Sequence, residues 1–173
     1  MDPAEPEVVT IRDGSVLYVR RVQPSDKPHF TQGFARLSRE SRYFRFLADR
    51  KELSEADLIY LTEVDFEDHY AVVTFRRLEN GEEEGVGVAR FVRLTDRPEA
   101  AEVAVTVVDS WQRRGVGTML YDRLLAAARK RGISILRSDI HFENRGIRDL
   151  LEKVAPATVI TREGNVVTLE LEI

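Results

Sequence analysis

The segment that most constrains the fold lies between residues 100 and 132. A valine-rich stretch predicts a strand over 100–108, a loop with two glycines follows, and apolar residues at helical spacing predict an amphipathic helix over 117–131. Gly132 marks the end of that helix. A helix start binds anions, because its first four amide N–H groups have no internal partners and its dipole is positive there. We therefore expect a phosphate ester on this loop.

The glycines and arginines of the loop strengthen that expectation. Gly115 and Gly117 let a bulky diphosphate approach the backbone closely, and Arg113 and Arg114 add positive charge. Two common phosphate-binding loops do not match. A Walker A motif requires Gly-Lys-Ser/Thr, which is absent, and a dinucleotide-binding fingerprint requires a third glycine where Leu120 stands. A plain glycine turn with incidental arginines is the alternative without a ligand.

The whole chain predicts one α/β (α+β) domain over 1–173. Its 173 residues suffice for one ordinary core, and no internal repeat or long linker divides them. Apolar patterns and turn residues predict strands at 16–22, 69–77, 86–94, 100–108, 133–140, 158–162 and 166–173. Capping residues and helical spacing predict helices at 24–37, 40–46, 54–63, 117–131 and 144–153. This order predicts a central mixed sheet of about seven strands flanked by about four or five helices.

Composition narrows the classes of function. The chain has no cysteine, which excludes a disulfide framework, a thiolate metal site and a cysteine nucleophile. Its net charge is −4, so no global basic field favours nucleic acid. No apolar run reaches the roughly 20 residues that span a bilayer, and the acidic, proline-containing start predicts no secretory leader. We expect a cytoplasmic protein that acts without nucleic acid, membrane or metal.

The loop sequence Gln112-Arg113-Arg114-Gly115-Val116-Gly117 resembles the Gln/Arg-x-x-Gly-x-Gly/Ala signature of the GNAT superfamily of N-acetyltransferases. Over about 16–153 the chain also resembles the acetyltransferase domain of Pat-type bacterial protein lysine acetyltransferases. That resemblance rests on passages 36–47, 61–65 and 101–105, together with Leu53-Ser54. It implies the GNAT fold with a V-shaped splayed sheet, acetyl-CoA as cosubstrate, and direct transfer to a primary amine. It also implies lysine side chains of metabolic enzymes as acceptors.

The resemblance further implies roles for individual residues. Backbone groups around Val107 would bind the pantetheine arm at a bulge in the strand. The diphosphate would lie on the residues of the loop: Gln112, Arg113, Arg114, Gly115, Val116, Gly117 and Thr118. Asn144 matches a helix-opening asparagine that contacts the cofactor arm, or it only caps its helix. Leu151 stands where many members carry a tyrosine general acid, so that acid is absent. Ala155-Pro156 replaces a frequent Gly-Phe pair beside the acceptor.

Glu102 is the predicted catalytic base. Alternation along the strand places it on one face with Ala104 and Thr106, and small neighbours suit a carboxylate that lines a cavity. Glu102 also matches the position of the Pat-type general base. A lysine amine has a pKa of about 10.4 and must lose a proton to attack, so Glu102 would take it directly or through water. The alternative is a solvent-facing glutamate in a cross-strand ion pair.

Weaker features leave alternatives open. Four arginines recur every third residue and form either a basic stripe for an acidic protein surface or a solvated helix face: Arg36, Arg39, Arg42 and Arg45. His29, His69 and His141 have no metal-ligand spacing, and only His69 is a candidate for acceptor binding. Two other functions remain. One is a small-molecule amine acetyltransferase with a narrow acidic pocket, and the other is a catalytically silent acyl-CoA-binding module.

Overall fold

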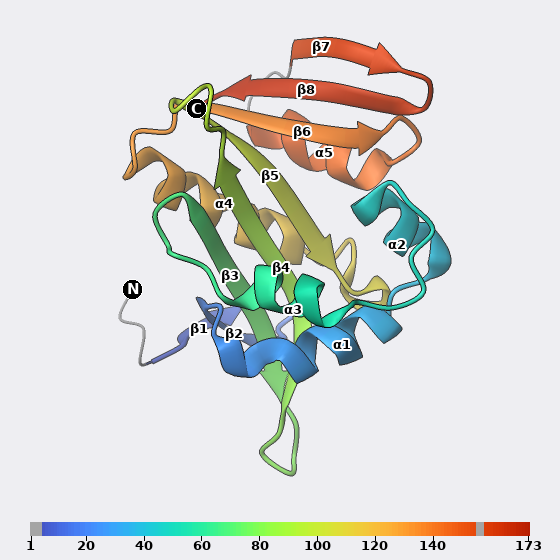
Figure 1. Cartoon of the computed structure of the whole chain (residues 1–173). Coiled ribbons are helices and arrows are strands. Elements are labelled where there is room, and N and C mark those ends of the chain that lie inside the picture. The colour runs from blue at the N-terminus through green and yellow to red at the C-terminus, as the bar shows by residue number, and fades with distance from the viewer. Residues whose placement is uncertain (1–4, 155–157) are drawn as a thin grey trace.

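The computed structural model describes residues 5–154 and 158–173 and contains one eight-stranded sheet (Figure 1). The strands are β1 (Glu7–Thr10), β2 (Val16–Arg21), β3 (His69–Arg77), β4 (Glu83–Arg93), β5 (Ala100–Val107), β6 (Ile135–His141), β7 (Thr158–Glu163) and β8 (Val166–Glu172). The helices are α1 (Lys27–Ala35), α2 (Arg39–Phe46), α3 (Glu55–Thr62), α4 (Val116–Arg129) and α5 (Arg145–Val154). Two 3-10 turns precede helices: η1 (Pro24–Asp26) and η2 (Asp109–Trp111).

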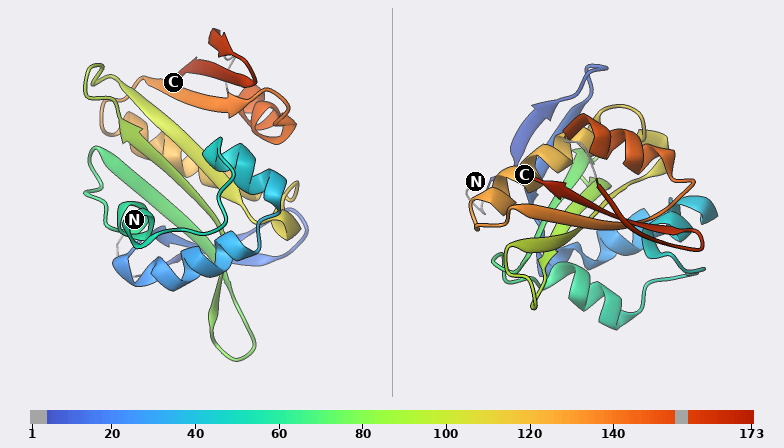
Figure 2. Two further views of the ribbon diagram at one scale, coloured as in Figure 1. Left: turned by 45° about the vertical axis from the view of Figure 1, so that its right-hand side comes forward. Right: turned by 90° about the horizontal axis from the view of Figure 1, so that it is seen from above.

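The helices cover both faces of the sheet. α1, α2 and α3 lie on one face, and α4 and α5 lie on the other, as Figure 2 shows from two directions. The strand order is β1-β2-β3-β4-β5-β6-β8-β7, with antiparallel pairs throughout the described strands except between β5 and β6. The mixed sheet and its helices confirm the predicted fold class.

The N-terminal part differs from the sequence prediction in two places. The sheet gains β1, a four-residue strand that pairs with β2 through a turn at Gly14, whose φ is +86°. Four residues with an acidic start are too short and too polar to show a strand pattern. The helix expected over 24–37 begins as the separate turn η1, and α1 ends at Ala35.

Local signals set several helix ends. Ser54 and Asp57 form a reciprocal capping box at the start of α3, with the Ser54 hydroxyl accepting from the Asp57 amide at 3.1 Å. Gly132 has a φ of +71° just after α4, as predicted. No helix within 5–154 or 158–173 is long and apolar enough to cross a membrane.

The main core lies between the sheet and α4. Leu120, Tyr121 and Leu124 of α4 are fully buried against apolar strand residues that include Phe91. Gly87 of β4 allows this close packing, because a Cβ there would lie 2.9 Å from the Thr106 carbonyl oxygen and 3.1 Å from Leu120 Cδ1. The start of α4 is thereby held against the end of β5, where the candidate site lies.

Candidate active site

The candidate site begins where β5 and β6 separate. The two strands pair in parallel only at Ala100–Ile135, Ala101–Leu136 and Glu102–Arg137. β4, by contrast, follows β5 as far as Val107. One edge of residues 103–107 is therefore not paired with β6, and the two strands diverge in Figure 1. This is the predicted V-shaped splay, and the open edge of β5 presents backbone N–H and C=O groups to a ligand.

The bulge expected at Val107 is not in β5. β4 and β5 keep one register from Arg93–Ala101 to Gly87–Val107. The irregularity lies instead between β3 and β4, at Thr74/Phe75, and it leaves Val86 as the extra residue of β4. The Val86 carbonyl accepts from the Val108 amide at 3.0 Å, so the bulge borders the end of β5 from the neighbouring strand.

The start of α4 has the geometry of an anion site. Gly115 is the N-cap with a φ of +89°, a conformation that favours glycine. Its carbonyl accepts the amide of Met119 at 3.0 Å, which is the first bond of the helix. The amides of 115–118 therefore have no partner within α4. Val116 is 1% exposed, so only its backbone can meet a ligand.

The structure separates two loop arginines that the sequence treated alike. Arg114 donates to Asp13 at 2.6 Å and stacks on Trp111, with its guanidinium carbon 3.9 Å from the ring centroid. Hydrogen bonds from Ser15 lower the pKa of Asp13, and Arg114 adds to that effect. Arg113 is exposed and forms no ion pair with the described residues. Of the two arginines, Arg113 is therefore the one whose guanidinium is not held by a carboxylate of the described residues, and its contact with a diphosphate stays a prediction.

Two further loop residues tie the helix start to the strand. Gln112 donates its side-chain amide to the Val107 carbonyl at 3.0 Å, so this predicted site residue positions the loop. Gly117 faces Val107 and Leu150: a Cβ there would lie 4.0 Å from Val107 Cγ2 and 3.7 Å from Leu150 Cδ2. Thr118 follows in the same first turn and is partly buried. The structure thus brings the predicted loop residues together with the end of β5.

α5 carries the remaining cofactor-side prediction. The Asn144 side-chain oxygen accepts from the Ile147 amide at 3.2 Å, so this residue caps α5, and contact with a cofactor stays a prediction. Leu151 is fully buried in the core, so this position carries no proton donor. The Ala155-Pro156 replacement lies outside the described residues.

Glu102 is the last β5 residue that pairs with β6, and its side chain is exposed. No described basic residue lies within ion-pair distance of it, so the cross-strand pair considered from the sequence is not found in 5–154 or 158–173. Arg45 of α2 lies within electrostatic reach of the Glu102 carboxylate. Burial lowers the pKa of Arg45, and the charge of Glu102 opposes that effect.

The four arginines at every third position do not form one stripe. Arg36 donates to the Gly85 carbonyl at 2.8 Å, and Arg42 donates to the Phe34 carbonyl at 3.1 Å. Arg45 lines a cavity, whereas Arg39 extends into solvent and pairs with Asp49. A helix boundary separates Arg36 from the other three, which lie in α2. Within α2, a spacing of three residues falls short of the about 3.6 residues of one turn, so Arg39 and Arg45 point in different directions.

The histidines have separate structural roles. His141 is 4% exposed and packs against Phe44 of α2. His69 accepts a hydrogen bond from the guanidinium of Arg90, and burial, followed by the charge of Arg90, lowers the pKa of His69 to about 4. Across 5–154 and 158–173, no group of three or more His, Asp or Glu side chains is placed to hold a metal.

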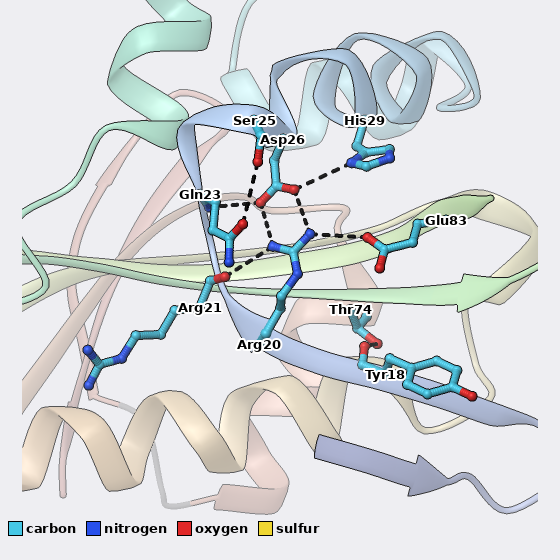
Figure 3. A network of polar contacts seen from close by, with 9 residues as sticks. All are labelled: Tyr18, Arg20, Arg21, Gln23, Ser25, Asp26, His29, Thr74 and Glu83. Carbon is cyan, nitrogen blue, oxygen red and sulfur yellow. Dashed lines mark hydrogen bonds and ion pairs between the residues drawn. The ribbon is translucent and has the colours of Figure 1, made fainter. Parts of the chain in front are cut away.

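Sequence reasoning missed a buried ion pair beneath α1 (Figure 3). Arg20 donates two hydrogen bonds to Asp26, at 2.7 and 2.8 Å, and a third to Glu83 at 3.2 Å. Asp26 is 2% exposed and also accepts from the Gln23 amide at 2.8 Å. An arginine in an otherwise apolar strand was the available signal, since buried charges are normally paired.

Sequence reasoning also missed a cavity of about 90 Å³ between α1, α2 and the sheet. Arg90 of β4 lines it and is 3% exposed. The signal was again a single charge inside an apolar strand, in the run from Val86 to Val92. Neither the alternation along β4 nor the loop motif indicates which segments cover Arg90. The residues that surround it can be identified only from the folded structure.

Comparisons with known proteins agree with this geometry. Residues 33–155 match the model of the acetyltransferase (GNAT) family. The chain is 33% identical over 163 residues to acetyltransferase Pat of Mycolicibacterium smegmatis, with 94% of this chain and 48% of Pat covered. It is also 33% identical over 143 residues to acetyltransferase PA5475 of Pseudomonas aeruginosa, with 83% of this chain and 76% of that protein covered.

A solved structure shows the same likeness in three dimensions. The GNAT domain of S. lividans PAT superposes with a TM-score of 0.85 at 28% identity and covers 97% of both chains. The chain spans about half the length of Pat, 48%, so the likeness to that protein is to its acetyltransferase part. The family match, the splayed sheet and the helix start at Gly115 agree. The chain therefore belongs to the acetyltransferase (GNAT) family.

Proposed function

We propose that this domain transfers the acetyl group of acetyl-CoA to a lysine side chain on a protein surface, by direct attack in a ternary complex. The observation that carries the proposal is the position of Glu102. Its carboxylate is exposed at the point where β5 and β6 part, on the sheet face that carries α1, α2 and α3. An exposed base suits an amine that a large acceptor brings to the surface.

The cofactor and the acceptor would use different parts of the site. The diphosphate would lie on the free amides of 115–118 with Arg113 beside it, and the arm would follow the open edge of β5 towards Glu102. Asn144 would meet the arm from the start of α5. Glu102 would take the proton that the lysine ammonium must lose, so that the amine can attack the thioester carbonyl. With Leu151 buried, solvent would protonate the departing thiolate.

The described cavity does not favour a small-molecule amine as acceptor. Such a ligand would need a narrow acidic pocket, whereas the only carboxylate among the described lining residues is Asp26. Asp26 is already held by both terminal nitrogens of Arg20. The acceptor side therefore offers no free negative charge inside the cavity, and Glu102 remains the carboxylate available to an amine.

The test is acetyl transfer to defined acceptors. Lysine peptides and folded proteins would be incubated with acetyl-CoA while released CoA is measured, and mass spectrometry would locate the acetyl group. We expect acetylation of lysine Nε by the wild type, a large loss in Glu102→Gln, and no change in Glu79→Gln, an exposed glutamate in the β3–β4 turn. CoA release only with small amines would contradict the lysine acceptor. Acetyl-CoA binding without CoA release for any amine would indicate a silent binding module.

A further inference from the structure

The cavity of about 90 Å³ lies on the same face of the sheet as Glu102. The strand register shows this. Two cavity residues of β4, Val88 and Arg90, pair with Thr106 and Ala104 of β5. These two residues lie on the same face of β5 as Glu102, because every second residue of a strand points to the same side. Most lining side chains are apolar, among them Phe30, Phe34, Phe46, Leu53 and Leu61. The volume exceeds that of a single water site several times over, so it can take a short side chain.

Three guanidinium groups interrupt this apolar lining, and one of them, that of Arg20, is paired with Asp26. Arg90 is 3% exposed, donates from Nη1 to His69 Nε2 at 2.9 Å, and donates from Nη2 to the Leu61 carbonyl at 3.0 Å. Arg45 enters from α2. Neither has an ion-pair partner in the part of the chain that the structure describes. A buried charge normally pairs with an opposite charge, because desolvation without a partner costs several kcal/mol.

The surroundings do not neutralise these charges. Burial, together with the nearby charge of Arg45, lowers the pKa of Arg90 to about 9. His69, with a pKa of about 4, is uncharged at neutral pH. Glu102 acts on Arg45 only. Of the two positive charges of Arg45 and Arg90, only that of Arg45 is opposed by the charge of Glu102, so the pair has an excess of positive charge beside the proposed base.

We propose that Arg45 and Arg90 bind a carboxylate of the acceptor, so that the enzyme prefers lysines with an aspartate or glutamate nearby. The inference rests on the proposed function. Arg45 senses the charge of Glu102 and itself acts on Arg90, which connects the cavity to the base that meets the acceptor amine. A guanidinium pairs well with a carboxylate because its N–H groups match the two oxygens. The apolar walls would hold the methylene groups of the acidic side chain.

The test compares two lysine peptides that differ only by glutamate or glutamine beside the lysine. We expect kcat/KM with acetyl-CoA to be about tenfold or more higher for the glutamate peptide, the range of a hydrogen bond to a charged group. Arg45→Gln and Arg90→Gln should each bring the ratio close to one. Arg129→Gln, which removes an exposed arginine of α4, should retain the ratio. Circular dichroism would verify folding, and half-buried Arg45 serves as the second variant if Arg90→Gln does not fold.

Two further arms identify the source of the carboxylate and separate this inference from the proposed function. Equal kcat/KM for both peptides in the wild type would overturn it. An arginine-dependent preference for succinyl-CoA with the glutamine peptide would place the carboxylate on the acyl group and overturn the acceptor assignment. If neither peptide is acetylated, the affinity of each peptide can still be measured by calorimetry with CoA present, and this comparison tests the carboxylate site. Tighter, arginine-dependent binding of the glutamate peptide supports the carboxylate site although lysine transfer fails, and equal binding overturns it.

Discussion

Replacing Asp26 with asparagine should destabilise the fold by about 3 kcal/mol at pH 7. Asp26 is 2% exposed and accepts both terminal nitrogens of Arg20 at 2.7 and 2.8 Å. Asparagine keeps the volume but leaves Arg20 buried without its main counter-charge. Removing one member of a buried pair typically costs about 3–5 kcal/mol, and we take the lower end because Glu83 lies 3.2 Å from Arg20.

The effect should also depend on pH with a definite sign. Burial acts to raise the pKa of Asp26, but the hydrogen bonds from Arg20 and from the Gln23 amide outweigh it, and the pKa lies below its ordinary value. A lowered carboxyl pKa stabilises the fold above the unfolded pKa of about 3.9, and this contribution is lost as pH falls through the folded pKa. The difference between Asp26→Asn and wild type should therefore be largest at neutral pH and shrink in acid.

Urea unfolding followed by circular dichroism measures this difference. For a chain of this size, about 3 kcal/mol corresponds to a Tm decrease of about 6–12 °C. Asp96→Asn changes an exposed carboxylate in the β4–β5 loop and should stay within about 0.5 kcal/mol of wild type. A loss below about 1 kcal/mol for Asp26→Asn at pH 7 would refute the argument, since it would mean that the pair adds little to stability.

Three other substitutions test the start of α4, the packing of α4 against the sheet, and the cap of α3. Gly117→Val should weaken acetyl-CoA binding by about tenfold or more in calorimetry, because the branched side chain obstructs the helix start. The protein should stay folded, because a Cβ at residue 117 has room. Unchanged affinity would exclude this loop as the diphosphate site. Gly87→Ala should destabilise by about 1–3 kcal/mol, because its Cβ would lie 2.9 Å from the Thr106 carbonyl oxygen; a neutral result in urea unfolding would contradict that close approach. Ser54→Ala should cost about 1 kcal/mol through the lost cap of α3, and an unchanged midpoint would show that this cap is dispensable.

The strand, loop and helix start around the predicted cofactor site were predictable because their signals are local. A valine-rich strand, two glycines and a helix start lie next to one another in sequence, and short-range backbone rules relate them to an anion. The same locality explains the correct prediction of the turn at Gly132. Gln112 and Arg114 were assigned to the ligand from their place in the loop, but their side chains contact Val107 and Asp13. Asp13 is about one hundred residues away, and no local pattern indicates such a contact.

The cavity beside Glu102 was not predictable because it is assembled from distant segments. Arg45 comes from α2 and Arg90 from β4, and they meet only after α2 and α3 fold over the sheet. Periodicity grouped Arg45 with Arg36, Arg39 and Arg42, although a helix boundary separates Arg36 from the other three. The predicted alternation of β5, which places Glu102 on one face with Ala104 and Thr106, agrees with the observed register, since alternation along a strand is a local property. Only the fold shows that Arg45 is its electrostatic neighbour.

The pH dependence of kcat for Glu102→Gln tests the proposed catalytic role most directly. General-base assistance is typically worth about 10²–10⁴-fold, so kcat with a lysine acceptor should fall by that factor near pH 7, with acetyl-CoA affinity unchanged. The loss should shrink towards about pH 10, because the free amine then arrives deprotonated. Glu79→Gln should match wild type throughout. An undiminished kcat for Glu102→Gln across this range, or a loss confined to the acceptor KM, would contradict Glu102 as the base.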